Sequence, residues 1–188
     1  MGMNGPYQAF GSYGNGIIAY SGLSQNMGFS DRPPTGIAPL YSDFAAPYFA
    51  VSALMSALHR RERTGEGQFI ELAQSEAGIN LLGPNILEVT ANNQLPPRIG
   101  NRSRNAVPHG AYPCAGNDRW LAIACESDDD WRHLATALGH PDLVEDPRYA
   151  TLDARRASED ELDALIADWT RERDTWDAMH YLQSAGVI

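Results

Sequence analysis

Lysine is absent from this chain of 188 residues, and all 14 of its basic residues are arginines. Without lysine, the protein cannot form a Schiff base with a carbonyl substrate, and it cannot use the lysine of a phosphate-binding P-loop. Genome composition alone can also remove lysine from a sequence. The absence therefore excludes two kinds of chemistry without identifying a third.

Positive charge of any kind is scarce, since 24 acidic residues against 14 basic ones give a net charge of −10. The imbalance is −3 through Thr90, with 4 arginines and 7 acids, and −7 from Ala91 onward, with 10 arginines and 17 acids. Such a chain is not expected to present a broad basic face. Nucleic acid is therefore not expected as a partner.

Cysteine and long apolar runs are also missing. Two cysteines, Cys114 and Cys125, are too few for a disulfide framework or a zinc site, and we expect each to be a reduced, half-buried strand residue. The five histidines do not have the spacing of metal ligands. No apolar run approaches the roughly 20 residues that span a bilayer, and no basic segment precedes an apolar one at the start. We expect a cytoplasmic protein with no metal and no membrane contact.

The clearest element in the sequence is a long helix that opens between Pro39 and Pro47 and stops at Thr64-Gly65. Apolar residues recur along it at three- and four-residue spacing, which predicts a helix with one apolar face. Many of these residues are alanines, which favours close packing against a neighbour. We expect Pro47 to lie in the first turn, where its missing N–H is tolerated, and Gly65 to end the helix.

Asp43 stands at the predicted start of this helix. Unsatisfied backbone N–H groups place about half a positive charge there, which favours an ionised carboxylate. The same N–H groups could receive charge that develops on a neighbouring acyl carbon. An ordinary aspartate N-cap is the alternative interpretation, because aspartate is among the preferred caps. Position alone does not decide between the two.

The remaining segments predict an α/β protein in two parts. Residues 1–39 are loop-rich apart from a short helix or strand at Gly16 to Leu23. A strand at residues 68–73 and a helix at residues 75–90, kinked at Gly83-Pro84, complete a first part of residues 1–90. Residues 91–107 are expected to be a linker.

Residues 108–188 are expected to form a small α+β domain. Residues 109–114 and 119–125 flank a Gly-Asn turn and predict a hairpin. The following helices are expected to be capped by Ser127 or Asp128, by Ser158 and by Asp174, and the four tryptophans are expected in the core. Asp128 to Asp130 fit helix N-terminal charge better than a cation site. Gly11 to Gly16 lack the strand and helix of a dinucleotide motif. His109 has the least ordinary setting of the histidines.

Two blocks of sequence carry a resemblance to a known family. The first combines Tyr41-Ser42-Asp43 with the run from Ala53 to Leu72, which contains Ala57-Leu58, Arg60 and Thr64-Gly65-Glu66-Gly67-Gln68. The second contains Gly100-Asn101-Arg102, Pro108-His109-Gly110, Asp146-Pro147-Arg148 and Leu182 to Val187. Together they resemble the family III CoA-transferases, also called the CaiB/BaiF or formyl-CoA transferase family, over nearly the whole chain.

The resemblance implies a fold, a reaction and an assembly. It implies part of a Rossmann-like large domain followed by a small α+β domain, a middle piece of a chain roughly twice as long, and an interlocked homodimer. It places the catalytic aspartate at Asp43, whose carboxylate would attack an acyl-CoA thioester and pass through an aspartyl anhydride and an aspartyl-CoA thioester. Coenzyme A thioesters and carboxylic acids would be substrates, with no tightly bound cofactor.

Two alternatives stay open. The α-methylacyl-CoA racemases resemble the same sequence, but they pair the aspartate with a histidine whose matching position is Asn15, and asparagine cannot act as a base. Their further acidic residue falls at Ser127, one place after Glu126. A non-catalytic domain that keeps only the fold is the other alternative.

Overall fold

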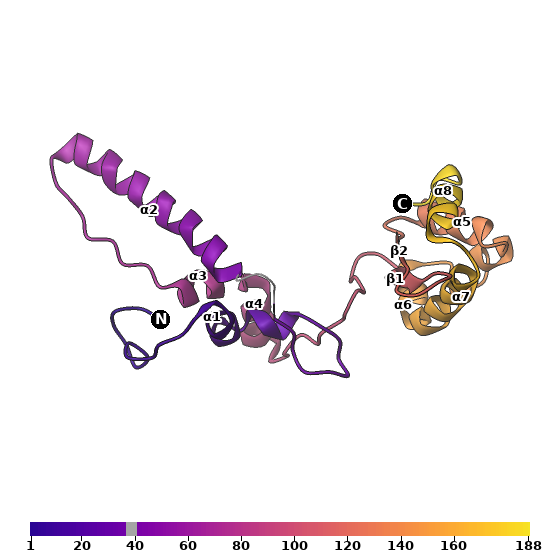
Figure 1. Cartoon of the computed structure of the whole chain (residues 1–188), viewed down its shortest axis with the longest axis horizontal. Coiled ribbons are helices and arrows are strands. Elements are labelled where there is room, and N and C mark those ends of the chain that lie inside the picture. The colour runs from indigo at the N-terminus through magenta and orange to yellow at the C-terminus, as the bar shows by residue number, and fades with distance from the viewer. Residues whose placement is uncertain (37–40) are drawn as a thin grey trace. The chain divides into compact units, whose positions relative to one another are not determined.

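The computed structural model describes residues 1–36 and 41–188, and it combines many helices with a small antiparallel sheet. The chain divides into two compact units, Met1–Gly100 and Asn101–Ile188. Figure 1 shows the first unit in indigo and magenta and the second in orange and yellow. Each unit is described by itself.

The first unit consists of helices joined by extended segments. It contains α1 (Gly14–Ser21), the 3-10 helix η1 (Leu23–Asn26), α2 (Tyr41–Thr64), α3 (Gln74–Asn80) and α4 (Gly83–Asn92). α1, α2 and α3 contact one another in pairs. A small core of Ile18, Leu23 and Leu82 holds the unit together. α1 and α3 approach closely because Gly78 has no side chain: a Cβ there would lie 2.9 Å from the Cβ of Ser21.

The predicted long helix is confirmed as α2, which projects from the rest of its unit (Figure 1). Its expected start at Pro39-Leu40 lies outside the described residues. Gly65, with φ +76°, ends the helix, and its N–H donates to the carbonyl of Arg61 at 2.8 Å. Beyond Pro47 the apolar side chains are largely exposed, including Tyr48 at 77% and Met55 at 60%. Within the described residues of its own unit, no neighbour covers this alanine-rich face beyond Pro47.

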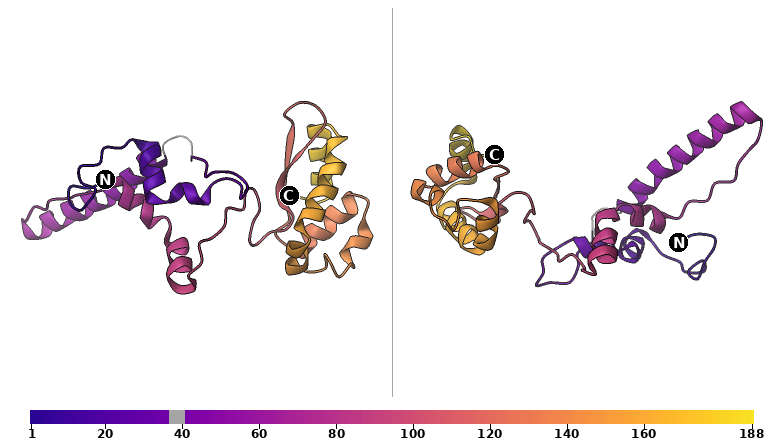
Figure 2. Two further views of the ribbon diagram at one scale, coloured as in Figure 1. Left: turned by 90° about the horizontal axis from the view of Figure 1, so that it is seen from below. Right: turned by 180° about the vertical axis from the view of Figure 1, so that it is seen from behind.

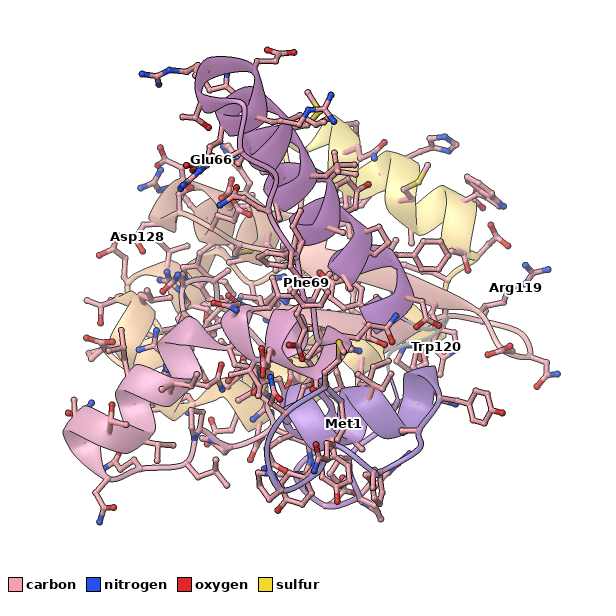
Figure 3. All side chains as sticks on the ribbon, turned by 90° about the vertical axis from the view of Figure 1, so that its left-hand side faces the viewer. Met1, Glu66, Phe69, Arg119, Trp120 and Asp128 are labelled. Atoms are coloured by element: carbon pink, nitrogen blue, oxygen red, sulfur yellow. The ribbon has the colours of Figure 1, made fainter. Side chains whose placement is uncertain are left out.

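The prediction of a strand at residues 68–73 is wrong. These residues are extended, but they pair with no strand in the described part of the chain. A strand needs a partner whose N–H and C=O groups complete its ladder. Phe69 is 79% exposed on this segment (Figure 3). The side chain of Glu71 accepts hydrogen bonds instead, from the backbone N–H of Met3 and from Asn4 Nδ2.

The helix predicted at residues 75–90 forms as two helices rather than one kinked helix. α3 ends at Asn80 and α4 begins at Gly83, with Pro84 in its first turn. Proline has no N–H to continue a preceding helix, but it fits the first turn of a new one. The interruption therefore lies at Gly83-Pro84 as predicted, but it separates two helices instead of bending one.

The second unit packs helices against a hairpin. It contains β1 (His109–Pro113), β2 (Trp120–Ala124), α5 (Asp128–Ala137), the 3-10 helix η2 (Pro141–Val144), α6 (Leu152–Ala157), α7 (Glu159–Arg171) and α8 (Thr175–Ser184). β1 and β2 are antiparallel, with His109 opposite Ala124 and Pro113 opposite Trp120. α7 contacts β1 and α8 contacts β2. The left view of Figure 2 shows the yellow and orange helices of this unit beside its hairpin. The predicted hairpin is confirmed.

The helix caps of the second unit follow the sequence prediction with one exception. Ser127 and Asp130 form a reciprocal capping box at the start of α5, and Asp174 accepts from the N–H groups of Trp176 and Asp177 at the start of α8. Ser158 precedes α7, but its side chain makes no cap hydrogen bond. These bonds satisfy backbone N–H groups that a helix start leaves free.

The tryptophans do not all lie in the core. Trp131 is buried at 1% exposure and Trp169 is partly buried against the same cluster. Trp120 and Trp176 are exposed at 55% and 64%, so the core prediction is wrong for both. Trp120 follows Arg119 on the hairpin (Figure 3), and its Nε1 donates to Asp118 Oδ1. Its indole N–H is satisfied without burial.

A charged cluster holds the beginning of the second unit against α7. Arg102 forms ion pairs with Glu159 at 3.5 Å, with Asp163 at 2.7 Å and with Asp160. Tyr112 donates to Asp163 Oδ1 at 2.8 Å. Glu159 is only 7% exposed, and its Oε1 has no hydrogen-bond partner among the described residues. Burial raises the pKa of Glu159 above its ordinary value, in spite of the attraction of Arg102.

We expect Glu159→Gln to stabilise the second unit at neutral pH, because an amide removes a buried charge. A raised pKa in the folded state means that the native protein holds its proton at higher pH than the unfolded chain. Stability is therefore lost as pH rises from the ordinary glutamate range through the raised value. The gain should be about 1 kcal/mol at pH 7 and should vanish at a pH below the ordinary value. Denaturant titrations of both proteins at the two pH values measure it.

Glu172→Gln is the matched control, because Glu172 is exposed at the opposite end of α7 and should show no such difference. A Glu159→Gln variant that is less stable than the wild type at neutral pH would mean that the attraction to Arg102 outweighs the cost of burial.

Candidate active site around Asp43

Asp43 is the third residue of α2 and not its N-cap, since the helix begins at Tyr41. The ordinary cap interpretation is therefore wrong, while the placement of Asp43 at the helix start is correct. Tyr41 and Ser42 are already helical, so Pro47, which was expected in the first turn, is the seventh residue of α2. Asp43 lies in the first turn, where the N–H groups have no intrahelical acceptor and the helix dipole favours negative charge.

Pro47 changes the backbone at Asp43. In an α-helix, the N–H of residue i+4 donates to the carbonyl of residue i, and for Asp43 that residue is Pro47. Proline has no N–H, so it leaves the Asp43 carbonyl without its usual helical donor. The turn that carries the Asp43 side chain is therefore less completely bonded than the helix behind it.

Gln74 provides the hydrogen bond to the Asp43 side chain. Its Nε2 donates to Asp43 Oδ1 at 3.0 Å. Gln74 is the first residue of α3, and both side chains are partly buried. The two residues are 31 positions apart, so their contact depends on the packing of α2 against α3.

Ser42 ties the same turn to α1. It is buried at 1% exposure, and its Oγ donates to the carbonyl of Gly14 at 3.4 Å. This contact brings the start of α2 to the start of α1, where Asn15 is the next residue. Asn15 is exposed and lies in the first turn of α1. Its amide cannot take up a proton as a histidine would.

Exposed aromatic residues lie near Asp43 in the sequence and before α1. Tyr41 and Phe44, on either side of Ser42 and Asp43, are exposed at 42% and 63%, and Tyr13 before α1 is exposed at 91%. Among the described residues, Asp43 takes part in no ion pair. The Asp43 carboxylate is therefore partly exposed, with exposed aromatic residues near it in the sequence.

The other residues considered from the sequence have local roles in their own elements. Ser127 caps α5, and Asp128 to Asp130 form the first turn of that helix, as the charge interpretation predicts. His109 opens β1, with its Nδ1 at 2.5 Å from the carbonyl of Asn101. The glycines of residues 11–16 lead into α1.

The cysteines are buried and free, just beyond the ends of the two strands. Burial is the main cause that raises the pKa of Cys125 to about 12, and the charge of Asp130 adds to it. A thiol in this state holds its proton at neutral pH and is a poor nucleophile. We therefore assign Cys125 a packing role.

The described residues contain neither a metal-binding cluster nor a membrane-spanning helix. Side chains of His, Cys, Asp and Glu do not gather there in groups of three that could hold a metal ion. None of the helices described combines the length and apolar character that crossing a bilayer requires.

Gln74 is the residue that the sequence did not reveal. A glutamine after an apolar run carries no chemical signature. Its relation to Asp43 appears only when α2 and α3 pack together. The only indication in the sequence is its position: Gln74 lies at the start of the helix predicted at residues 75–90, as Asp43 lies at the start of the helix before it.

Comparison with known proteins identifies the family. The profile of CoA-transferase family III matches residues 1–188. A succinyl-CoA–D-citramalate CoA-transferase of Chloroflexus aurantiacus is 37% identical over 169 residues, which cover 90% of this chain and 42% of that protein. A formyl-CoA:oxalate CoA-transferase of Streptomyces coelicolor is 28% identical over 197 residues, which cover 97% of this chain and 48% of that protein.

Solved structures share the fold. A CaiB/BaiF family protein of Brucella suis superimposes with a TM-score of 0.88 at 31% identity, over 100% of this chain and 49% of that one. The Mycobacterium tuberculosis protein Rv3272 superimposes with a TM-score of 0.77 at 24% identity, over 100% of this chain and 48% of that one, which shows the fold alone. The chain thus spans about half the length of the proteins it matches. It belongs to CoA-transferase family III, with the mixed helix and sheet fold of the CaiB/BaiF proteins.

Proposed function

We propose that the protein carrying this chain transfers CoA from an acyl-CoA thioester to a carboxylic acid, with Asp43 as the covalent nucleophile. The observation that carries the proposal is a reachable carboxylate in the first turn of α2, hydrogen-bonded by Gln74, in a chain that matches family III from end to end. In this proposal residues 1–90 are part of the large domain, residues 91–107 are a linker, and residues 108–188 are the small domain.

The proposed reaction has four exchanges. The Asp43 carboxylate attacks the thioester carbon, a C–O bond forms, and the CoA thiolate leaves with the electron pair of the C–S bond. The thiolate then attacks Cγ of Asp43 and expels the donor acid as a carboxylate. An acceptor carboxylate attacks the aspartyl-CoA thioester and releases the thiolate again. The thiolate attacks the acceptor's carbonyl carbon, which restores Asp43 and yields the new acyl-CoA.

This reaction matches a site without a base. In each of the four reaction steps the nucleophile is already an anion, and the leaving group departs as a thiolate or a carboxylate. No proton needs to move, so a neighbouring histidine or lysine is unnecessary. The described surroundings of Asp43 contain amide and hydroxyl groups, which suit charge stabilisation. Asn15 at the racemase histidine position gives no support to α-proton exchange.

The relatives suggest which substrates to test first. Their names pair succinyl-CoA with D-citramalate, mesaconate or L-malate, and they pair formyl-CoA or acetyl-CoA with oxalate. In each pair we take the CoA thioester as the donor of CoA and the acid as its acceptor. These acceptors all carry two carboxylates. We propose a small dicarboxylate acceptor, and a homodimer in which the exposed apolar face of α2 is covered.

The test is detection of the covalent intermediate in the complete protein that contains residues 1–188. The protein is incubated with succinyl-CoA, treated with hydroxylamine, digested, and analysed by mass spectrometry. We expect a hydroxamate on the peptide that contains Asp43 and on no other acidic residue. A thioester that is consumed while Asp43 stays unmodified would contradict covalent catalysis at this residue.

A further inference from the structure

We propose that Gln74 stabilises the negative charge that develops on Asp43 when the aspartyl carbonyl carbon is itself attacked. The inference rests on the proposed function and adds a second residue to its chemistry. It starts from one contact, the 3.0 Å hydrogen bond between Gln74 Nε2 and Asp43 Oδ1.

The chemistry of the two side chains fixes the direction of this bond. An ionised carboxylate only accepts hydrogen bonds, so the amide must present its NH2 group and not its oxygen. The bond reaches Oδ1, and within the described residues no side chain donates to Oδ2. The two carboxylate oxygens therefore differ: Oδ1 is held, and Oδ2 is available for attack on the thioester.

The held oxygen keeps its place through the covalent steps. When Oδ2 attacks, it becomes the bridging oxygen of the anhydride, and Oδ1 becomes the carbonyl oxygen on the aspartyl side. Thiolate attack at Cγ then moves the π electrons onto Oδ1, and expulsion of the acid through Oδ2 restores the carbonyl. Attack of the acceptor on the aspartyl-CoA thioester places negative charge on Oδ1 a second time. A donor already aimed at Oδ1 stabilises both tetrahedral intermediates.

Packing and one side-chain hydrogen bond position the residues next to Gln74 and Asp43, although the Asp43 carbonyl lacks its helical donor. Ala73 and Ala77, on either side of Gln74, are buried at 4% and 3%. α3 lies so close to α1 that a methyl group at Gly78 would collide with Ser21. Ser42, which precedes Asp43, is buried and bonded to Gly14. A donor and an acceptor on such fixed elements need little reorganisation when charge develops, which is the condition for strong oxyanion stabilisation.

The steps of the reaction should respond differently to loss of this donor. The hydrogen bond also stabilises the free carboxylate, so its removal should leave the first attack on the thioester unchanged or slightly faster. The two attacks at Cγ should become slower by about 100-fold, the typical effect of removing one oxyanion donor. General damage to the site would slow all of these steps together.

The experiment compares the wild type with Gln74→Leu in the complete protein that contains this chain. Succinyl-CoA labelled either in the succinyl group or in the CoA is mixed with the protein without acceptor, and the reaction is quenched with acid over time. We expect the wild type to accumulate CoA label. The variant should acquire succinyl label at the wild-type rate and CoA label about 100-fold more slowly. Gln74→Met, which also lacks the donor, should behave in the same way.

Asn80→Ala is the matched control, because Asn80 carries an amide at the other end of α3 and bonds only to its own helix. It should label like the wild type. Equal slowing of both labels in the leucine and methionine variants, or wild-type labelling in both, would overturn the role of Gln74. Asp43→Ala separates this failure from failure of the proposed function: if the wild type acquires no more label than Asp43→Ala, covalent catalysis itself is wrong.

Discussion

Asp43→Asn should abolish CoA transfer while leaving α2 in place. Removal of a covalent nucleophile typically lowers the turnover number by several orders of magnitude, and we expect a loss of at least about 10,000-fold. The amide is almost isosteric with the carboxylate, and its oxygen can still accept from Gln74 Nε2. It loses only the favourable interaction of a charge with the helix start, about 0.3 to 1 kcal/mol. Transfer from succinyl-CoA to a panel of dicarboxylates, followed by chromatography of the acyl-CoA products, measures the effect.

Asp31→Asn is the control for this change, because Asp31 is an exposed acid in the same unit that pairs with Arg32. It should keep wild-type turnover. Circular dichroism of the two variants should match the wild type. An Asp43→Asn protein that transfers CoA at the wild-type rate would remove Asp43 from the mechanism and would return it to a structural role at the helix start.

Local patterns predicted the parts of the fold that depend on local interactions. The spacing of alanines and other apolar residues predicted α2, Gly65 ended it as expected, and the Gly-Asn turn gave the hairpin. Ser127 and Asp174 were predicted as caps because their bonds reach only two or three residues along the chain. Asp43 belongs to this group, since a first-turn position is also a local property.

The errors occurred where structure depends on distant partners. Residues 68–73 have the composition of a strand, but a strand exists only where a second strand completes its hydrogen bonds. Trp176 fits an apolar stripe and is nevertheless exposed, because the outer side of α8 carries no covering element in its unit. Gln74 escaped notice for a related reason: its partner is 31 residues away. The sequence therefore singled out Asp43 and missed the residue whose side chain is hydrogen-bonded to it.

Arg155 is a second residue whose importance the sequence hides, and its replacement should have the largest effect on stability. It is 1% exposed. Its guanidinium donates to the carbonyls of Val107 at 3.0 Å and Tyr149 at 3.1 Å and to Asp128 Oδ1 at 2.7 Å. Arg155→Met fills much of the same volume but leaves both buried carbonyls without donors. We expect a loss of about 2 to 5 kcal/mol, because each buried carbonyl that is left without a donor costs about 1 to 3 kcal/mol.

Tryptophan fluorescence during denaturant unfolding of the 188-residue chain measures this loss, because its four tryptophans, Trp120, Trp131, Trp169 and Trp176, all lie in the second unit. Arg171→Ala is the control: Arg171 is an exposed partner of Asp168, and such pairs contribute about 0.5 kcal/mol or less. Arg155→Lys separates charge from geometry. A lysine keeps the positive charge, but its ammonium group cannot reach all three acceptors as the planar guanidinium does. It should be nearly as unstable as the methionine variant. A lysine variant as stable as the wild type would mean that charge alone, and not the three-way hydrogen bonding, holds the start of α5 to the segment before β1.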